Sequence, residues 1–183
     1  ADRADHQRGG QHRAPRGALM RNMLVLLAVL PTFALAEDRA TVDVLESCLT
    51  APAAGSDARD CIGVIATQCM AAPEGQTTVG MMQCALAEAE AWDVLLNRYY
   101  RQARALARDM DAGDRADFPE FAVRAATLLD AQRAWISFRD ANCTAQYAQW
   151  GAGTMRQIIG ADCQLEMTAL RTISLYQYAT MLR

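Results

Sequence analysis

The chain has 183 residues, with 18 Arg, no Lys and 21 acidic residues, and its formal net charge is −3. This length is enough for one domain with its own hydrophobic core. The excess of acidic residues argues against nucleic acid and anionic membrane surfaces as partners.

The N-terminal region has the composition of a targeting segment. Residues 1–19 contain four Arg and both His, His6 and His12, without an apolar period, so we expect them to be disordered or upstream of the true start. Residues 20–36, MRNMLVLLAVLPTFALA, join a basic start to an apolar stretch and an Ala-x-Ala end, the pattern of a secretory signal peptide. The apolar stretch is shorter than the roughly 20 residues that span a bilayer. We therefore expect cleavage after Ala36 and a periplasmic or secreted bacterial protein without a membrane span after cleavage.

The part of the chain that follows Ala36 contains no His. This absence excludes Ser-His and Cys-His catalysis, and zinc sites that need imidazole. We therefore expect no enzyme, no catalytic residue, no metal and no cofactor. Residues 37–183 carry 13 Arg and 19 acidic residues, a net charge of −6. This charge suits a cationic partner, although it is also ordinary for a soluble domain.

Six Cys lie after the predicted cleavage site: Cys48, Cys61, Cys69, Cys84, Cys143 and Cys163. An even number in an exported chain favours disulfides, and no Cys-x-x-Cys pair indicates a zinc or thioredoxin-type site. Cys143 and Cys163 lie at similar distances from an expected helix turn at 151–153, which favours their pairing. Pairing of chain neighbours among the other four gives Cys48–Cys61 and Cys69–Cys84, although six Cys allow about fifteen connectivities.

Apolar periodicity and capping residues predict five helices, over 41–49, 57–70, 79–110, 119–150 and from 154 close to the C-terminus. We expect Gly113 to end the third helix and the fifth to kink, or to begin only after, 160–162. No segment shows sustained period-2 alternation. The prediction is an all-α, disulfide-bonded antiparallel bundle of three long helices, with two short N-terminal helices across it. Residues 37–76 would form a Cys-rich segment and 77–183 the main helical domain.

Two segments carry an unusual set of polar and aromatic residues. The first, 84–100, contains Trp92, Asp93, Asn97 and Tyr100. The second, AQRAWISFRDANC at 131–143, is followed by a Gly-rich turn at 150–154 and then by further residues of the set. From the second segment onward the set comprises Gln132, Arg133, Trp135, Arg139, Asp140, Cys143, Cys163, Thr168 and Arg171.

This combination resembles the LprI-like family, small exported bacterial domains named after a mycobacterial lysozyme inhibitor, over about residues 80–175. The resemblance implies a helical fold and inhibition of a lysozyme through protein–protein contact. Two features depart from the family pattern. The chain lacks the lipidation Cys of the mycobacterial lipoprotein, and its segment 41–76 is longer and richer in Cys than a minimal family domain.

The motif residues themselves favour a structural role. Gln132, Trp135, Arg139 and Cys143 share one face of a helix, on which Trp135 is an apolar anchor. Arg139 needs a partner if it is buried, and the candidates are Glu88, Glu90, Asp93 and Asp140. The functional alternative is that Arg139, Asp140, Trp92 and Asn97 form a polar cleft for a small ligand.

An acidic stretch between the third and fourth helices is the best candidate contact for a partner. It offers Asp109, Asp111, Asp114, Asp117 and Glu120 on an expected loop, and it lacks the pattern of a calcium-binding EF-hand. The alternative is a solvated turn. The leading functional hypothesis is an exported inhibitor of a basic lysozyme or another cationic envelope protein. A structural or stress-protective envelope protein without a dedicated target is the runner-up.

Overall fold

The computed structural model describes the backbone of residues 32–181, with side chains from Arg39 onward. The predicted segment 1–19, and most of the predicted signal peptide, lie outside these residues. Within the described range the chain is helical and has no strand, so the predicted all-α class is confirmed. The helices are α1 (Thr32–Thr50), α2 (Val64–Met70), α3 (Thr78–Asp114), α4 (Arg124–Gln149) and α5 (Met155–Thr180), with 3-10 turns η1 (Ala58–Cys61), η2 (Pro73–Gln76) and η3 (Pro119–Phe121).

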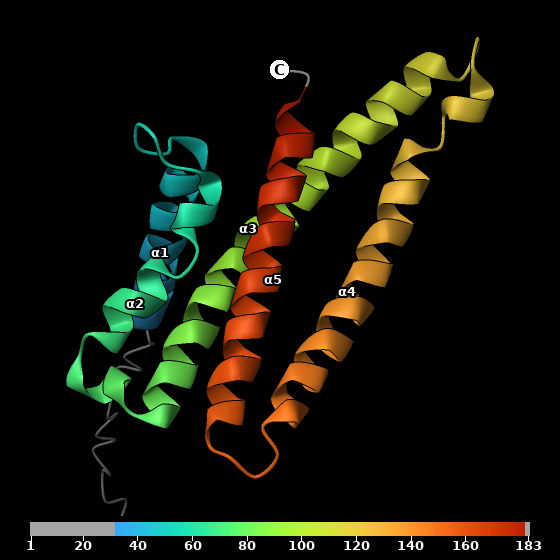
Figure 1. Cartoon of the computed structure of the whole chain (residues 1–183). Helices are drawn as coiled ribbons and strands as arrows, with labels where there is room; N and C mark the ends of the chain where they lie inside the picture. The colour runs from blue at the N-terminus through green and yellow to red at the C-terminus, as the bar shows by residue number, and fades with distance from the viewer. Residues whose placement is uncertain (1–31, 182–183) are drawn as a thin grey trace, which may run out of the picture. The chain divides into compact units, whose positions relative to one another are not determined.

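The three long helices form the predicted antiparallel arrangement. Figure 1 shows the chain running along α3, back along α4 and forward again along α5. The closest association is between α3 and α5, which bury Trp92, Leu95, Ala103, Ala169 and Leu175. Ala at the contact positions lets the two backbones approach closely, and Trp92 and the leucines supply most of the apolar area.

The helix α4 packs less deeply than its neighbours. Only Gln132 and Cys143 are buried along its 26 residues, and Ile136 and Phe138 are exposed. Gly160 on α5 lies under the Tyr147 ring, where an added Cβ would come within 3.2 Å of a ring carbon. Residues 160–162 are therefore a close packing position and not a kink, since α5 continues through them without a break.

The N-terminal segment packs on α3. The helix α1 begins nine residues before the predicted start at 41, and it buries Leu45 and Leu49 in the core. The predicted helix over 57–70 is divided into η1 and α2. Gly63 causes the break because its φ of 87° lies in the left-handed region, which an α-helix cannot include.

The connection between α3 and α4 differs from the prediction. Gly113 does not end α3, which continues to Asp114. Gly in a helix interior costs only about 1 kcal/mol relative to Ala, so it need not stop a helix. The helix α4 begins at Arg124 and not at 119, because Pro119 lies in the separate turn η3. The unpaired N–H groups at the start of α4, those of Arg124 and Ala125, donate to the Asp111 carboxylate.

Three disulfides join the described Cys residues: Cys48–Cys61, Cys69–Cys84 and Cys143–Cys163. They are the pairs that the sequence favours. The first links α1 to η1, the second links α2 to α3, and the third links α4 to α5, with Cα atoms 5.4 Å apart in the third.

Candidate functional site

Glu88 is the centre of a buried polar group on α3. Its side chain is fully buried. The carboxylate accepts hydrogen bonds from the backbone N–H groups of Gly63 and Ala66, both at 2.7 Å, and from Trp92 Nε1 at 2.9 Å. Gly63 has no side chain to cap α2, so Glu88 supplies the cap from another helix. The motif residue Trp92 therefore orients a structural carboxylate and does not face a cleft.

The motif pair Asp93 and Asn97 lies one turn apart on the exposed face of α3. Asn97 Nδ2 donates to Asp93 Oδ2 at 2.8 Å and to the Asp93 carbonyl at 2.9 Å. Trp92 is fully buried and lines no cleft, whereas Asp93 and Arg139 line one surface pocket together with Thr168.

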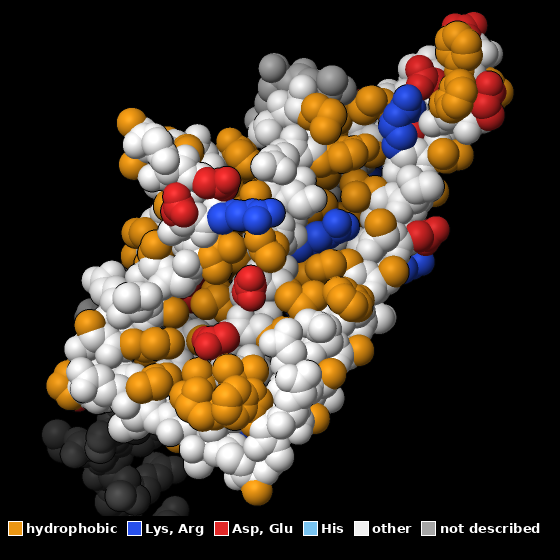
Figure 2. All heavy atoms as spheres, viewed as in Figure 1, with side chains coloured by type: hydrophobic (Ala, Val, Ile, Leu, Met, Phe, Trp, Pro, Cys, Tyr) orange, Lys and Arg blue, Asp and Glu red, His pale blue; other side chains and the backbone are white. Residues whose placement is uncertain are grey.

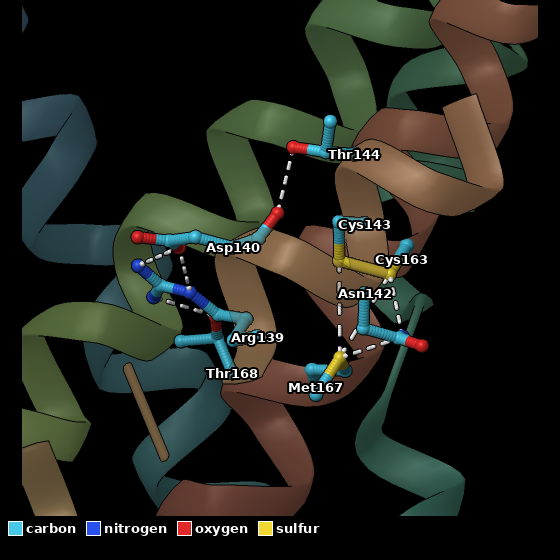
Figure 3. The surroundings of a disulfide bond; sticks show 8 residues. All are labelled: Arg139, Asp140, Asn142, Cys143, Thr144, Cys163, Met167 and Thr168. Carbon is cyan, nitrogen blue, oxygen red and sulfur yellow. Dashed lines mark hydrogen bonds and ion pairs between the residues drawn. A yellow bond between two sulfur atoms is a disulfide. The ribbon is translucent and has the colours of Figure 1, made fainter. Parts of the chain in front are cut away.

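Arg139 finds its carboxylate next door in the chain. Its Nη2 lies 2.9 Å from Asp140 Oδ1, and its Nη1 donates to Thr168 Oγ1 on α5 at 3.4 Å (Figure 3). The guanidinium also lies over the Trp135 ring, 5.1 Å from its centroid. The Asp140 side chain is 57% exposed, so this ion pair contributes little to stability. Trp135 and Thr168 make the contacts that attach Arg139 to the bundle.

The α4–α5 disulfide has a sulfur and amide environment (Figure 3). Met167 Sδ lies 3.8 Å from both Cys143 Sγ and Cys163 Sγ. Asn142 Nδ2 points to the same place, 3.2 Å from Met167 Sδ and 3.5 Å from Cys163 Sγ. Asn142 is therefore engaged in α4–α5 packing.

A second polar group lies where α3, α4 and α5 meet; we call it the arginine cluster and define it as Tyr100, Arg104, Gln132 and Arg171. Arg171 Nε donates to Gln132 Oε1 at 2.9 Å. The Arg104 guanidinium lies 5.9 Å from the centre of the Tyr100 ring. Burial lowers the pKa of Arg171, and the nearby Tyr100 partly offsets this effect. The motif thus brings Tyr100, Gln132 and Arg171 together from three helices, while Arg133 is exposed.

Three polar atoms of this cluster are buried without a hydrogen-bond partner among the described residues: Tyr100 Oη, Arg104 Nε and Arg171 Nη2. A buried donor left unpaired costs on the order of 1–3 kcal/mol. The sequence pattern does not identify Arg104 as a buried residue, because an Arg on an amphipathic helix normally faces solvent and its spacing gives no other signal.

The acidic stretch divides into structural and exposed residues. Asp111 lies in α3 and is buried, and its carboxylate accepts from the N–H groups of Arg124 at 3.0 Å and Ala125 at 2.9 Å. Asp114, at the end of α3, pairs with Arg124 at 2.7 Å. Burial alone would raise the pKa of Asp111, but these N–H groups and the Arg124 guanidinium hold it below its ordinary value.

The prediction of one acidic loop is therefore wrong in its geometry. Asp109 lies within the expected helix, and α3 extends beyond the expected end at 110 to include Asp111 and Asp114. Asp111 faces the start of α4. Asp109, Asp117 and Glu120 are the exposed acids of the stretch. Beside the last two, Phe118 is 54% exposed and Phe121 is 58% exposed, with ring centroids 6.4 Å apart. Sequence patterns could not show that these rings stay outside the core.

A known protein family matches this helical region in sequence. The sequence model of the family described as "Lysozyme inhibitor LprI" matches residues 69–175, more than half of the chain. The chain belongs to the LprI family. A protein of Rhizobium meliloti (strain 1021) that is described as uncharacterized is 33% identical over 108 residues, which are 56% of this chain and 76% of that protein. No solved structure matches.

The LprI match begins at Cys69 and therefore covers α3, α4 and most of α5, while α1 precedes it. It contains Glu88, the arginine cluster and the α3–α4 connection, whereas Gly63 and Ala66, which donate to Glu88, precede it. In the described part of this LprI-family chain, no group of His, Cys, Asp and Glu side chains is arranged to hold a metal ion. None of the described helices is long and apolar enough to cross a membrane.

Proposed function

We propose that the chain is an exported inhibitor that binds a cationic lysozyme and covers its substrate cleft, without chemistry of its own. Family membership supports the target, and the charge of −6 on residues 37–183 suits a basic enzyme. Disulfides and the signal-like segment 20–36 support export.

The contact surface that we propose is the α3–α4 tip, defined as residues 115–123. It combines exposed rings, Phe118 and Phe121, with exposed carboxylates, Asp117 and Glu120. Aromatic side chains are enriched at the energetic centres of interfaces, and rim charges raise the association rate. An apolar pair flanked by acids therefore fits a partner with a cleft and a basic surface.

The base of the tip is fixed on both sides. Asp111 accepts from the first turn of α4, and the Asp114–Arg124 pair links the last turn of α3 to the first residue of α4. Holding a binding loop between rigid helices lowers the entropy lost on association. The sequence predicts all five acids of the stretch as contacts. We instead assign Asp111 and Asp114 to the support of the tip, whereas Asp109, Asp117 and Glu120 can face the partner.

A lysis assay tests the proposal. Disulfide-intact protein, residues 37–183, is added to a suspension of cell walls and a basic lysozyme, and turbidity is followed at low and high salt. We expect slower lysis, with weaker inhibition at high salt because the screening length falls from roughly 8 Å at physiological ionic strength to about 3 Å at 1 M. An unchanged lysis rate at several-fold molar excess and low salt would reject inhibition of that lysozyme.

The contact is tested separately. Phe118→Ser with Phe121→Ser should weaken inhibition at least about tenfold, the loss of one or two interface anchors. Phe138→Ser is the matched control, since Phe138 on α4 is 61% exposed and lies outside the tip. Asp117→Asn with Glu120→Gln should slow association and reduce its salt dependence. Equal inhibition by the Phe118/Phe121 variant and the control would place the contact elsewhere on the protein.

A further inference from the structure

Among the described residues, the two arginines of the cluster lack the acidic partner that three other partly buried arginines have. Arg98 pairs with Glu46, Arg124 with Asp114 at 2.7 Å, and Arg139 with Asp140 at 2.9 Å. Arg156, which is also partly buried, donates to the Gly151 carbonyl instead. Across the described residues, neither Arg104 nor Arg171 forms an ion pair, and the acceptor of Arg171 is the neutral amide oxygen of Gln132.

The lack of a carboxylate partner is a feature of the arginine cluster and not of the composition of the chain. Residues 37–183 contain more acids than arginines, 19 against 13, so acidic residues are not scarce. A guanidinium removed from water normally keeps a carboxylate or phosphate partner, because an unpaired buried charge is costly. The Arg104 and Arg171 guanidinium groups have no acidic partner on α3, α4 or α5. They therefore leave an excess of positive charge between these helices.

The three unpaired donors belong to neighbouring side chains, with Tyr100 between the two arginines. Tyr100 Oη, Arg104 Nε and Arg171 Nη2 are all buried and lack an acceptor in the described structure. Tyr100 contacts Arg104 through its ring, and it lies close enough to Arg171 to influence that group electrostatically. The Trp135 ring, 5.9 Å from the Arg171 guanidinium, forms an adjoining apolar wall.

The cluster is also reachable from outside. Tyr100, Arg104, Trp135 and Arg171 each keep partial exposure. Figure 2 shows basic side-chain atoms between α5 and α4, with apolar side chains around them. A small ligand can therefore meet the guanidinium groups from the surface, while the atoms beneath them are shielded from water.

We propose that the arginine cluster binds the oxyanion of a small acid, with Arg104 and Arg171 as the charged ligands and Tyr100 as a neutral donor. Arginine presents its N–H groups as a planar fork that matches carboxylate and phosphate oxygens. The Trp135 wall favours an acid that carries an apolar ring over an inorganic anion. This site is separate from the α3–α4 tip and does not depend on the proposed inhibition.

Calorimetric titration with sodium benzoate, and separately with inorganic phosphate, tests the proposal at constant ionic strength set with chloride. Thermal unfolding of the same samples provides a second readout. We expect saturable benzoate binding that raises the melting temperature. A preference for phosphate would retain the oxyanion site but reject the role of the Trp135 wall.

The variants Arg104→Gln and Arg171→Gln should each weaken binding at least tenfold. Arg101→Gln is the control, because Arg101 is exposed on the same helix and its loss changes the net charge equally. Arg104→Lys, which keeps the charge but loses the fork, serves if Arg104→Gln does not fold, and it should weaken binding to a lesser extent. Absence of saturable binding by both probes, or an equal effect of Arg101→Gln and Arg104→Gln, would overturn the site.

Discussion

Single polar residues on α3 make decisive contacts far along the chain. Glu88 joins α2 to α3 through two backbone N–H groups, and it fixes the Trp92 indole in the core at the same time. Hydrogen bonds to a charged group contribute about 1.5–3 kcal/mol each. The adjacent acid Glu90, two residues later on another helix face, is exposed. Two residues of the same type therefore differ completely in importance.

The substitution Glu88→Gln should lower the free energy of unfolding by about 3 kcal/mol, because an amide NH2 would face N–H donors in a buried place. Glu90→Gln is the matched control and should change it by less than about 0.5 kcal/mol. Urea denaturation followed by circular dichroism measures both. A loss no larger than that of the control would mean that the Glu88 bonds add little to stability.

At the scale of elements, α4 depends on a few specific attachments. It buries two side chains, and it is held at its start by Asp111, in its middle by Gln132 and at its end by Cys143. Its neighbours α3 and α5 instead share a continuous apolar interface. We infer that α4 is the long helix most easily separated from the bundle.

The α4–α5 disulfide should therefore control the exposure of α4. Replacing Cys143 and Cys163 together by Ser should reduce the stability by about 3 kcal/mol and should increase amide hydrogen exchange in α4 more than in α3 or α5. Replacing Cys48 and Cys61 by Ser is the control, since that bridge lies in the N-terminal segment. Unchanged exchange in α4 would show that side-chain packing alone holds it. Non-reducing peptide mapping of the unmodified protein checks all three pairs.

The start of α4 should be sensitive to acid. The folded-state pKa of Asp111 lies below the ordinary value of 3.8, so its stabilising effect is complete above that pH and is lost as the pH falls through the lowered pKa. Asp111→Asn should lower the melting temperature at neutral pH, and the difference from wild type should shrink in acid. Asp109→Asn, at an exposed position of the same helix, should change little. A difference that persists at low pH would contradict the carboxylate's role.

At the scale of the whole molecule, the N-terminal contacts that the structure describes involve residues that would remain after signal cleavage. Leu45 and Leu49 pack into the core, and Glu46 accepts from Arg98 and from Tyr99 Oη, the latter at 2.9 Å. Hydrogen bonding from Arg98 keeps the pKa of Glu46 below its ordinary value, so this link is ionised at neutral pH. All these residues follow Ala36.

From the signal-like segment 20–36 we propose that the protein is exported, begins at Glu37 and folds without residues 1–36. Intact-mass measurement of periplasmic material should give the mass of residues 37–183 with three disulfides and no free thiol. A species that keeps Met23 to Ala36 would contradict the signal-peptide interpretation. Alkylation of any Cys without a reductant would contradict complete pairing.

The sequence alone determined the helical class, the long helices and the family, because apolar periodicity and motif spacing are local properties of the chain. The turn at 151–153 and the register of Cys143 and Cys163 follow from the same local geometry. Tertiary structure decided which polar residues matter. Asp109 and Asp111 lie two residues apart with similar surroundings in sequence, and only the position of Arg124 and Ala125 makes Asp111 a cap. Arg139 and Arg171 are likewise both motif arginines, but a carboxylate lies beside the first alone. The partner of Arg139 is its neighbour in the chain, but spacing along one helix cannot specify the partners of Asp111 and Arg171, because these come from other elements that only folding brings near.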